Sequence, residues 1–167
     1  MHRVRTGPAS RVADAGGTVV GMSRRSVLAV GSFLLWTVFV WGVVRVRNIL
    51  GDDELSTASQ AWSLLLSATL WVPAVVLGVV LAASALRHRG LPSAARTGVA
   101  LLGVWTTVIW LIRGYDIAIA SDHGTGFIVV HLVLAAISVG LAVLAARSLG
   151  VVGRSSAEGD ALRTYSR

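Results

Sequence analysis

Long uncharged, apolar runs alternate with short charged segments along this chain. A helix that crosses a bilayer needs about 20 mostly apolar residues, and four of the runs reach or approach that length. An Arg at the edge of a run can be included, because its side chain reaches the headgroups while its stem stays in an apolar environment. The pattern predicts helical spans at about 26–45, 59–86, 95–113 and 124–147.

Composition indicates the same class of protein. Of the 167 residues, 54% are hydrophobic and only 14% are charged, whereas a soluble domain needs more charged residues to cover its surface. We therefore expect an all-α fold, a four-helix transmembrane up-down bundle over residues 25–149. Residues 1–24 and 150–167 are expected to be disordered cytoplasmic segments, and translation starts at either Met1 or Met22.

The charged residues between the spans predict the orientation. Arg outnumbers the acidic residues before the first span, between the second and third spans, and after the fourth span. Segment 45–58 instead mixes Arg with Asp and Glu, and segment 113–124 mixes Arg with Asp. Because an excess of Arg marks the cytoplasmic side, we expect a multi-pass plasma-membrane protein with both termini and segment 87–96 in the cytoplasm.

A short pattern occurs twice, at the outer ends of the first and third spans. WTVFVWGVVRVRNI (36–49) and WTTVIWLIRGYDI (105–117) both contain two Trp residues separated by four others, then an Arg, then a polar residue followed by Ile. The helices that follow also resemble each other loosely. The chain therefore indicates two tandem helix hairpins, and such repeats are related by an axis along the membrane normal.

Polar residues in and near the repeated pattern are the candidates for a ligand site. An ionisable residue inside a membrane span is a functional hypothesis by default, and His131 lies well inside the fourth run. The candidates for an outward-facing pocket are Arg45, Asn48, Arg113, Asp116, His123 and His131. Two alternatives remain: the repeat is a duplicated membrane anchor, and His131 is a neutral residue bonded to a hydroxyl of the second span (Ser63, Ser67 or Thr69).

The tryptophans are expected to divide by their depth in the membrane. Trp at the headgroup level anchors a span, so Trp41, Trp62 and Trp110 are expected to be membrane-interface anchors. Trp36 and Trp105 lie about five residues deeper, roughly 7.5 Å at the rise of an α-helix. We expect these two side chains to pack between helices.

Several kinds of chemistry find no support in the residues. The absence of Cys excludes thiolate metal sites and iron–sulfur clusters. His123 and His131 share one helix and cannot bind a haem from opposite faces, and no tight spacing of metal ligands occurs. Phosphate-loop, nucleophile-elbow and H-E-x-x-H motifs are missing as well. We expect no metal and no cofactor, and, because the basic residues are scattered, no nucleic-acid partner.

The stretches VWGVVRVRNILGDD and VWTTVIWLIRG, together with the use of Arg alone as the basic residue, carry a resemblance. The chain resembles small, uncharacterised four-span integral membrane proteins of high-GC Gram-positive bacteria over residues 26–149. This resemblance implies a plasma-membrane location. It implies no known activity, so no functional residue can be transferred.

Three classes of function follow. The first is a non-enzymatic accessory or scaffold subunit that packs against a protein partner or a second copy, and it is based on small residues spaced four apart on the helices. The second is a dimeric transporter or small-ligand-binding membrane protein that uses the outward-facing pocket. The third is a membrane enzyme that uses His131, Arg113 and Asp116 on a lipid headgroup. The lipid bilayer is the expected partner in all three.

Overall fold

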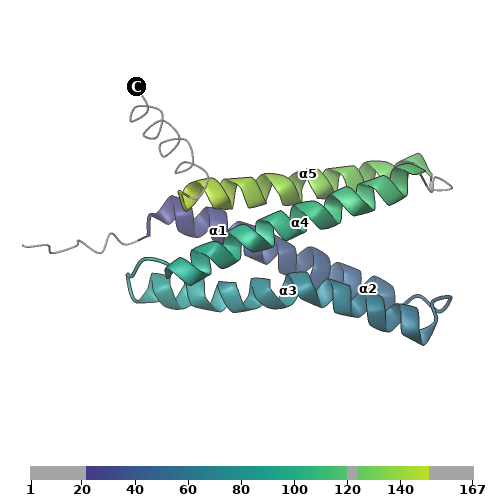
Figure 1. Ribbon diagram of the computed structural model, residues 1–167, viewed down its shortest axis with the longest axis horizontal. Coiled ribbons are helices and arrows are strands. Elements are labelled where there is room, and N and C mark those ends of the chain that lie inside the picture. The colour runs from purple at the N-terminus through teal and green to yellow at the C-terminus, as the bar shows by residue number, and fades with distance from the viewer. Residues whose placement is uncertain (1–21, 120–123, 151–167) are drawn as a thin grey trace, which may run out of the picture.

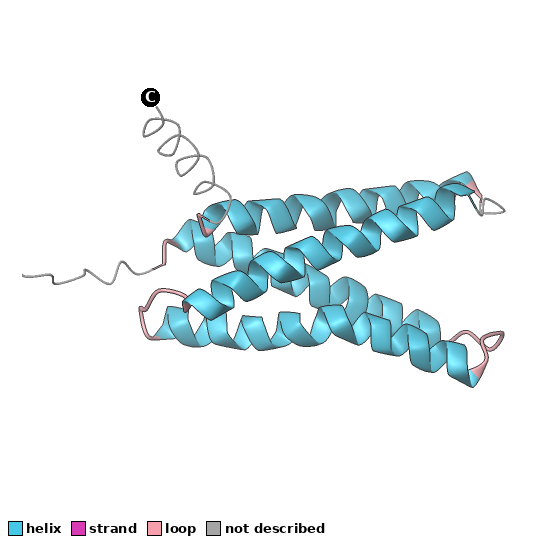
Figure 2. Ribbon diagram, in the orientation of Figure 1, coloured by secondary structure: helices cyan, strands magenta, loops and turns pink. Residues whose placement is uncertain are grey.

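The computed structural model describes residues 22–119 and 124–150, and all regular secondary structure in that part of the chain is helical (Figure 2). The elements are α1 (Arg24–Thr37), the π-helical segment η1 (Val38–Val44), α2 (Arg45–Leu50), α3 (Thr57–Leu86), α4 (Ser93–Ile119) and α5 (Thr125–Ser148). The first three form one continuous rod. The predicted terminal segments lie almost wholly outside the described residues.

Serine side chains define where two of the rods begin. The Ser23 hydroxyl accepts a hydrogen bond from the Ser26 backbone N–H at 3.1 Å. Ser56 does the same for the Ser59 N–H at 3.3 Å. A serine at this position satisfies one of the backbone donors that a helix leaves free at its start. The rods therefore begin at Arg24 and Thr57, two residues before the expected spans.

The four rods pack as a bundle in which each has two neighbours. The rod that begins with α1 contacts α3 and α5, and α4 contacts the same two helices. Figure 1 shows α4 beside α5 and α2 beside α3, with these two pairs diverging toward one end of the molecule. A core of apolar side chains from all four rods fills the interior, including Val30, Phe33, Leu70, Leu81, Val99, Leu102, Ile109 and Ala145. The predicted all-α four-helix bundle is confirmed.

The outer faces of the bundle are also apolar. Large hydrophobic side chains with more than half of their surface exposed include Leu28, Leu35, Val79, Leu101, Leu132 and Leu144. Four helices are long and apolar enough to cross a membrane, with mean hydropathies of 2.2, 2.4, 1.5 and 2.7. Apolar faces of this extent suggest contact with the lipid bilayer. The protein is thus an integral membrane protein with four candidate spans.

Two of the helices continue beyond the ends that the apolar runs indicated. The first rod reaches Leu50 instead of stopping near Arg45, and α4 reaches Ile119 instead of stopping near Arg113. An apolar run marks the part of a helix inside the hydrocarbon, and intrahelical hydrogen bonds can continue past that part. Arg45 and Arg113 therefore lie within helices, so the helix backbone fixes the direction in which each side chain leaves.

In the segment η1 the backbone hydrogen bonds span five residues, one more than in the α-helices on either side. In a regular α-helix the Arg45 N–H would donate to the Trp41 carbonyl, but here it donates to the Val40 carbonyl. The Trp41 carbonyl instead accepts a hydrogen bond from the Ser67 hydroxyl of α3 at 2.5 Å. A backbone carbonyl in a membrane span needs such a partner, so the buried Ser67 stabilises the π-helical segment.

Candidate functional site

A cavity of about 330 Å³ opens between α2, α4 and α5, where the two helix pairs diverge. We call it the polar cleft. Five of the six polar candidates line it, and these are Arg45, Asn48, Arg113, Asp116 and His131. His123 lies outside the described residues. Three separate helices therefore direct their polar residues to one place.

Apolar and aromatic side chains form the rest of the cleft wall. They are Val40, Trp41, Val44, Trp110, Ile117, Phe127, Val130 and Leu134. Sequence reasoning missed most of these residues, although helical spacing offered a signal. Phe127 is four residues before His131 and Val130 is one residue before it, so both lie near the His131 face of α5. The cleft thus combines a mostly apolar wall with a few polar groups, which is typical of small-molecule sites.

The π-helical segment explains how two differently spaced Arg residues reach the same cleft. Arg45 follows Trp41 by four residues, whereas Arg113 follows Trp110 by three. The wider turn of η1 absorbs the additional residue before Arg45. Insertions of this kind in α-helices frequently occur at functional sites. Both side chains are partly buried in the cleft lining.

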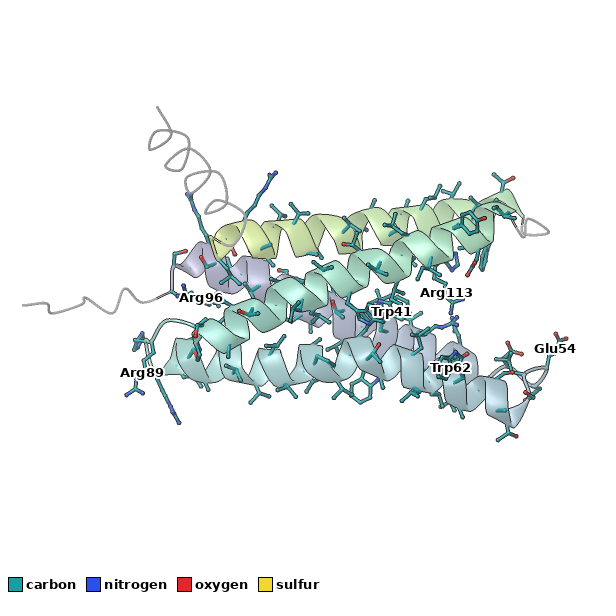
Figure 3. The ribbon with its side chains drawn as sticks, viewed as in Figure 1. Trp41, Glu54, Trp62, Arg89, Arg96 and Arg113 are labelled. Carbon is teal, nitrogen blue, oxygen red and sulfur yellow. The ribbon has the colours of Figure 1, made fainter. Side chains whose placement is uncertain are left out.

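Trp41 and Trp110 meet at the inner end of the cleft. Their rings pack edge to face, with centroids 5.8 Å apart and an interplanar angle of 63°. Only 5% of Trp41 and 7% of Trp110 is exposed. Figure 3 shows Trp41 deeper in the bundle than Arg113.

The rings of Trp41 and Trp110 contact each other across the bundle, so they stabilise a helix contact. The role of these two residues as membrane-interface anchors stays a prediction. The Trp110 Nε1–H is buried and has no hydrogen-bond partner in the described structure. Trp62 is 67% exposed on the outside of α3, and its anchoring role stays a prediction.

His131 is fixed by its own helix. Its Nδ1 lies 2.8 Å from the Phe127 carbonyl oxygen, and because a carbonyl can only accept, Nδ1 carries the hydrogen. The His131 ring also packs on the Phe127 ring, with centroids 3.9 Å apart. Two of the three alternative partners form other hydrogen bonds, since the Ser67 hydroxyl donates to the Trp41 carbonyl and the Thr69 hydroxyl donates to the Leu66 carbonyl. His131 Nε2 is therefore the nitrogen available to a molecule in the cleft.

The ionised groups of the cleft do not balance. Its described lining contains two guanidinium groups, Arg45 and Arg113, and one carboxylate, Asp116. Arg45 and Arg113 are both partly buried and carry like charges. Asp116 is exposed at the mouth. With His131 neutral, the cleft carries a formal charge of about +1, which favours an anionic group.

A second polar depression lies beside the cleft and is shallow. Asp52, Asp53 and Glu54 line it together with Arg47 and Asn48. These acids are exposed, and Asp52 accepts a hydrogen bond from the Glu54 N–H at 3.2 Å. Among the described residues, no group of three or more His, Asp or Glu side chains is placed to hold a metal ion.

The deeper tryptophans each form a hydrogen bond to a neighbouring helix, but only Trp36 is packed against the core, whereas Trp105 is 38% exposed. Trp36 Nε1–H donates to the Ser138 hydroxyl of α5 at 2.9 Å, and Trp105 Nε1–H donates to the Thr69 hydroxyl of α3 at 3.0 Å. Ser138 follows Thr69 by the same number of residues as Trp105 follows Trp36. The two hydrogen bonds therefore connect equivalent positions of the repeated pattern.

Comparison with known proteins finds no match for this chain among protein-family models, curated proteins or solved structures.

Proposed function

We propose that this chain is a non-enzymatic membrane protein that binds a small anionic ligand in the polar cleft. The observation that carries the proposal is the convergence of Arg45, Arg113 and His131, from three helices, on one cavity. Two partly buried guanidinium groups are only partly compensated by the exposed Asp116 carboxylate, so a further anion in the cleft would be favourable. A carboxylate or phosphate group would accept hydrogen bonds from both of them.

We further propose that the chain consists of two tandem hairpins, α1–α3 and α4–α5, related by a pseudo-two-fold axis along the membrane normal. The equivalent Trp36–Ser138 and Trp105–Thr69 hydrogen bonds support this relation. The contact between Trp41 and Trp110 also supports it, because equivalent residues near such an axis meet each other. The cleft would then lie close to the axis.

For the orientation, we propose that the cleft opens on the outer side of the plasma membrane. The opposite end of the bundle carries Arg89 and Arg96, while Glu54 lies at the cleft end (Figure 3). Because the chain has no Cys, single substitutions Ser56→Cys and Ser93→Cys give clean probes. A membrane-impermeant maleimide should label only Ser56→Cys in intact cells. Labelling of only Ser93→Cys would reverse the orientation.

Ligand binding is tested with the full chain in dodecyl maltoside micelles, using acetate and inorganic phosphate at constant ionic strength. We expect one or both anions to raise the unfolding temperature. Arg45→Gln and Arg113→Gln should each remove this effect, while Arg89→Gln, which changes an exposed Arg at the other end, should retain it. If all four proteins respond equally, the cleft is not an anion site.

The role of an accessory or scaffold subunit stays a prediction, as do transport and dimerisation. Native mass spectrometry of protein extracted gently from its own membrane addresses all three, because it preserves bound chains and bound small molecules. A stoichiometric protein partner would favour the accessory role. A retained anionic small molecule or lipid, lost on Arg113→Gln, would favour the polar cleft.

A further inference from the structure

A second cavity, of about 520 Å³, lies between α4 and α5 and adjoins the polar cleft. We call it the apolar groove. Trp110, Ile117 and His131 line both cavities, so the two share a wall. The groove contains no Arg, Asp or Glu in its lining. The charged side chains therefore line the polar cleft but not the apolar groove.

The groove exists because three of its lining residues are small. These are Gly114 of α4 and Ala135 and Ala136 of α5. A Cβ atom added at Gly114 would meet nothing within 4 Å. The rim is formed by exposed side chains, including Leu111 and Leu132. Since these side chains lie on the outer face of a membrane helix, the groove opens toward the acyl chains of the bilayer.

We propose, building on the anion site above, that the ligand is a single-chain anionic amphiphile that enters from the membrane between α4 and α5. Its charged headgroup lies between Arg45 and Arg113, and its hydrocarbon chain lies in the apolar groove. The shared wall at Trp110 and His131 marks the junction of head and chain.

Two features of the site favour this ligand over a free anion and over a zwitterionic lipid. A small water-soluble anion would use the polar cleft and leave the adjoining apolar groove unused. A zwitterionic lipid would bring its own cation to a cleft that already carries an excess of positive charge. An amphiphile with a carboxylate or phosphate headgroup matches both the charge of the cleft and the apolar character of the groove.

The test uses the full chain in phosphatidylcholine nanodiscs and three probes. Lysophosphatidic acid carries a phosphate headgroup and one chain, lysophosphatidylcholine carries the same chain with a zwitterionic headgroup, and glycerol phosphate is the headgroup alone. Apparent affinity is measured from ligand-induced thermal stabilisation. We expect lysophosphatidic acid to bind roughly tenfold or more tightly than either of the others. Over lysophosphatidylcholine it gains from its uncompensated anionic charge, and over glycerol phosphate it gains from burial of its hydrocarbon chain.

Two variants separate the groove from the anion site. Ala136→Phe fills the groove and should remove the advantage of lysophosphatidic acid over glycerol phosphate. Ala82→Phe is the matched control, because Ala82 is an exposed Ala on α3 outside both cavities. The double variant Arg45→Gln/Arg113→Gln should remove binding of lysophosphatidic acid and of glycerol phosphate.

The outcomes are distinct for the two proposals. If glycerol phosphate binds as tightly as lysophosphatidic acid, and Ala136→Phe behaves like the unmodified protein, the amphiphile proposal fails and the anion site stands. If the double Arg variant binds all probes normally, both proposals fail. Where Ala136→Phe is itself unstable, a brominated chain on lysophosphatidic acid serves instead. It should quench tryptophan emission more strongly than the same chain on lysophosphatidylcholine, and equal quenching would overturn the amphiphile proposal.

Discussion

Ser67 offers a direct test of the π-helical segment. Ser67→Ala removes the hydroxyl that donates to the Trp41 carbonyl. Leaving a buried acceptor unpaired costs about 1–3 kcal/mol, and hydrogen bonds between membrane helices average nearer about 0.6 kcal/mol. We therefore expect a loss of about 1 kcal/mol, which changes the folding equilibrium constant about fivefold.

A second change, made together with Ser67→Ala, should abolish this loss of folding stability. Deleting Val43 gives Trp41 and Arg45 the same spacing as Trp110 and Arg113, so the segment can become a regular α-helix. The Trp41 carbonyl then accepts from the backbone N–H four residues further on, and it no longer needs Ser67. Ser67→Ala should cost almost nothing in the deletion variant.

The assay is reversible unfolding by dodecyl sulfate in mixed micelles, followed by circular dichroism. It compares the unmodified protein, Ser67→Ala, the Val43 deletion and the double variant. Ser32→Ala is the control, since Ser32 is exposed on α1. An equal cost of Ser67→Ala with and without Val43 would refute the explanation, because it would show that Ser67 acts independently of the π-helical segment.

Two further predictions use the same assay. Gly42→Ala places a Cβ atom 3.3 Å from the Cβ and Cγ of Trp71 and should destabilise the protein by about 1–3 kcal/mol. In Gly140→Ala the added Cβ meets nothing within 4 Å, so this variant should be neutral or stabilise the protein by up to about 1 kcal/mol. A greater loss of stability in Gly140→Ala than in Gly42→Ala would contradict this packing. Trp36→Phe and Trp105→Phe each remove one interhelical hydrogen bond and should cost similar amounts, about 0.5–1.5 kcal/mol, and a cost confined to one of them would argue against equivalent roles.

The helices could be predicted from the sequence because bilayer thickness sets the length of an apolar run. That relation placed four spans within a few residues of the observed rods. It did not place the helix ends, since hydrogen bonding along the backbone, and not hydrophobicity, determines where a helix stops. The serines at Ser23 and Ser56 are local signals for two of the starts, and they act through the backbone.

The polar cleft could be predicted in part. His131 was selected because an ionisable residue inside a membrane span is a functional hypothesis by default, and Arg45 and Arg113 were selected from the repeated pattern. The structure brings all three to one cavity. The burial of Trp41 and Trp110 was not predicted. Position along a helix gives depth in the membrane, but the direction a side chain faces depends on how the helices are rotated against each other.

The additional residue between Trp41 and Arg45 was visible in the sequence, yet its consequence depended on another helix. A single inserted residue would normally turn every following side chain by about 100°, which would move Arg45 away from the cleft. A π-helical turn absorbs this rotation but leaves a carbonyl without its usual donor. Ser67 supplies that donor from α3. The direction of Arg45 in the cleft thus depends on a hydroxyl group of a different span, and the cleft should be sensitive to Ser67 even though Ser67 does not line it.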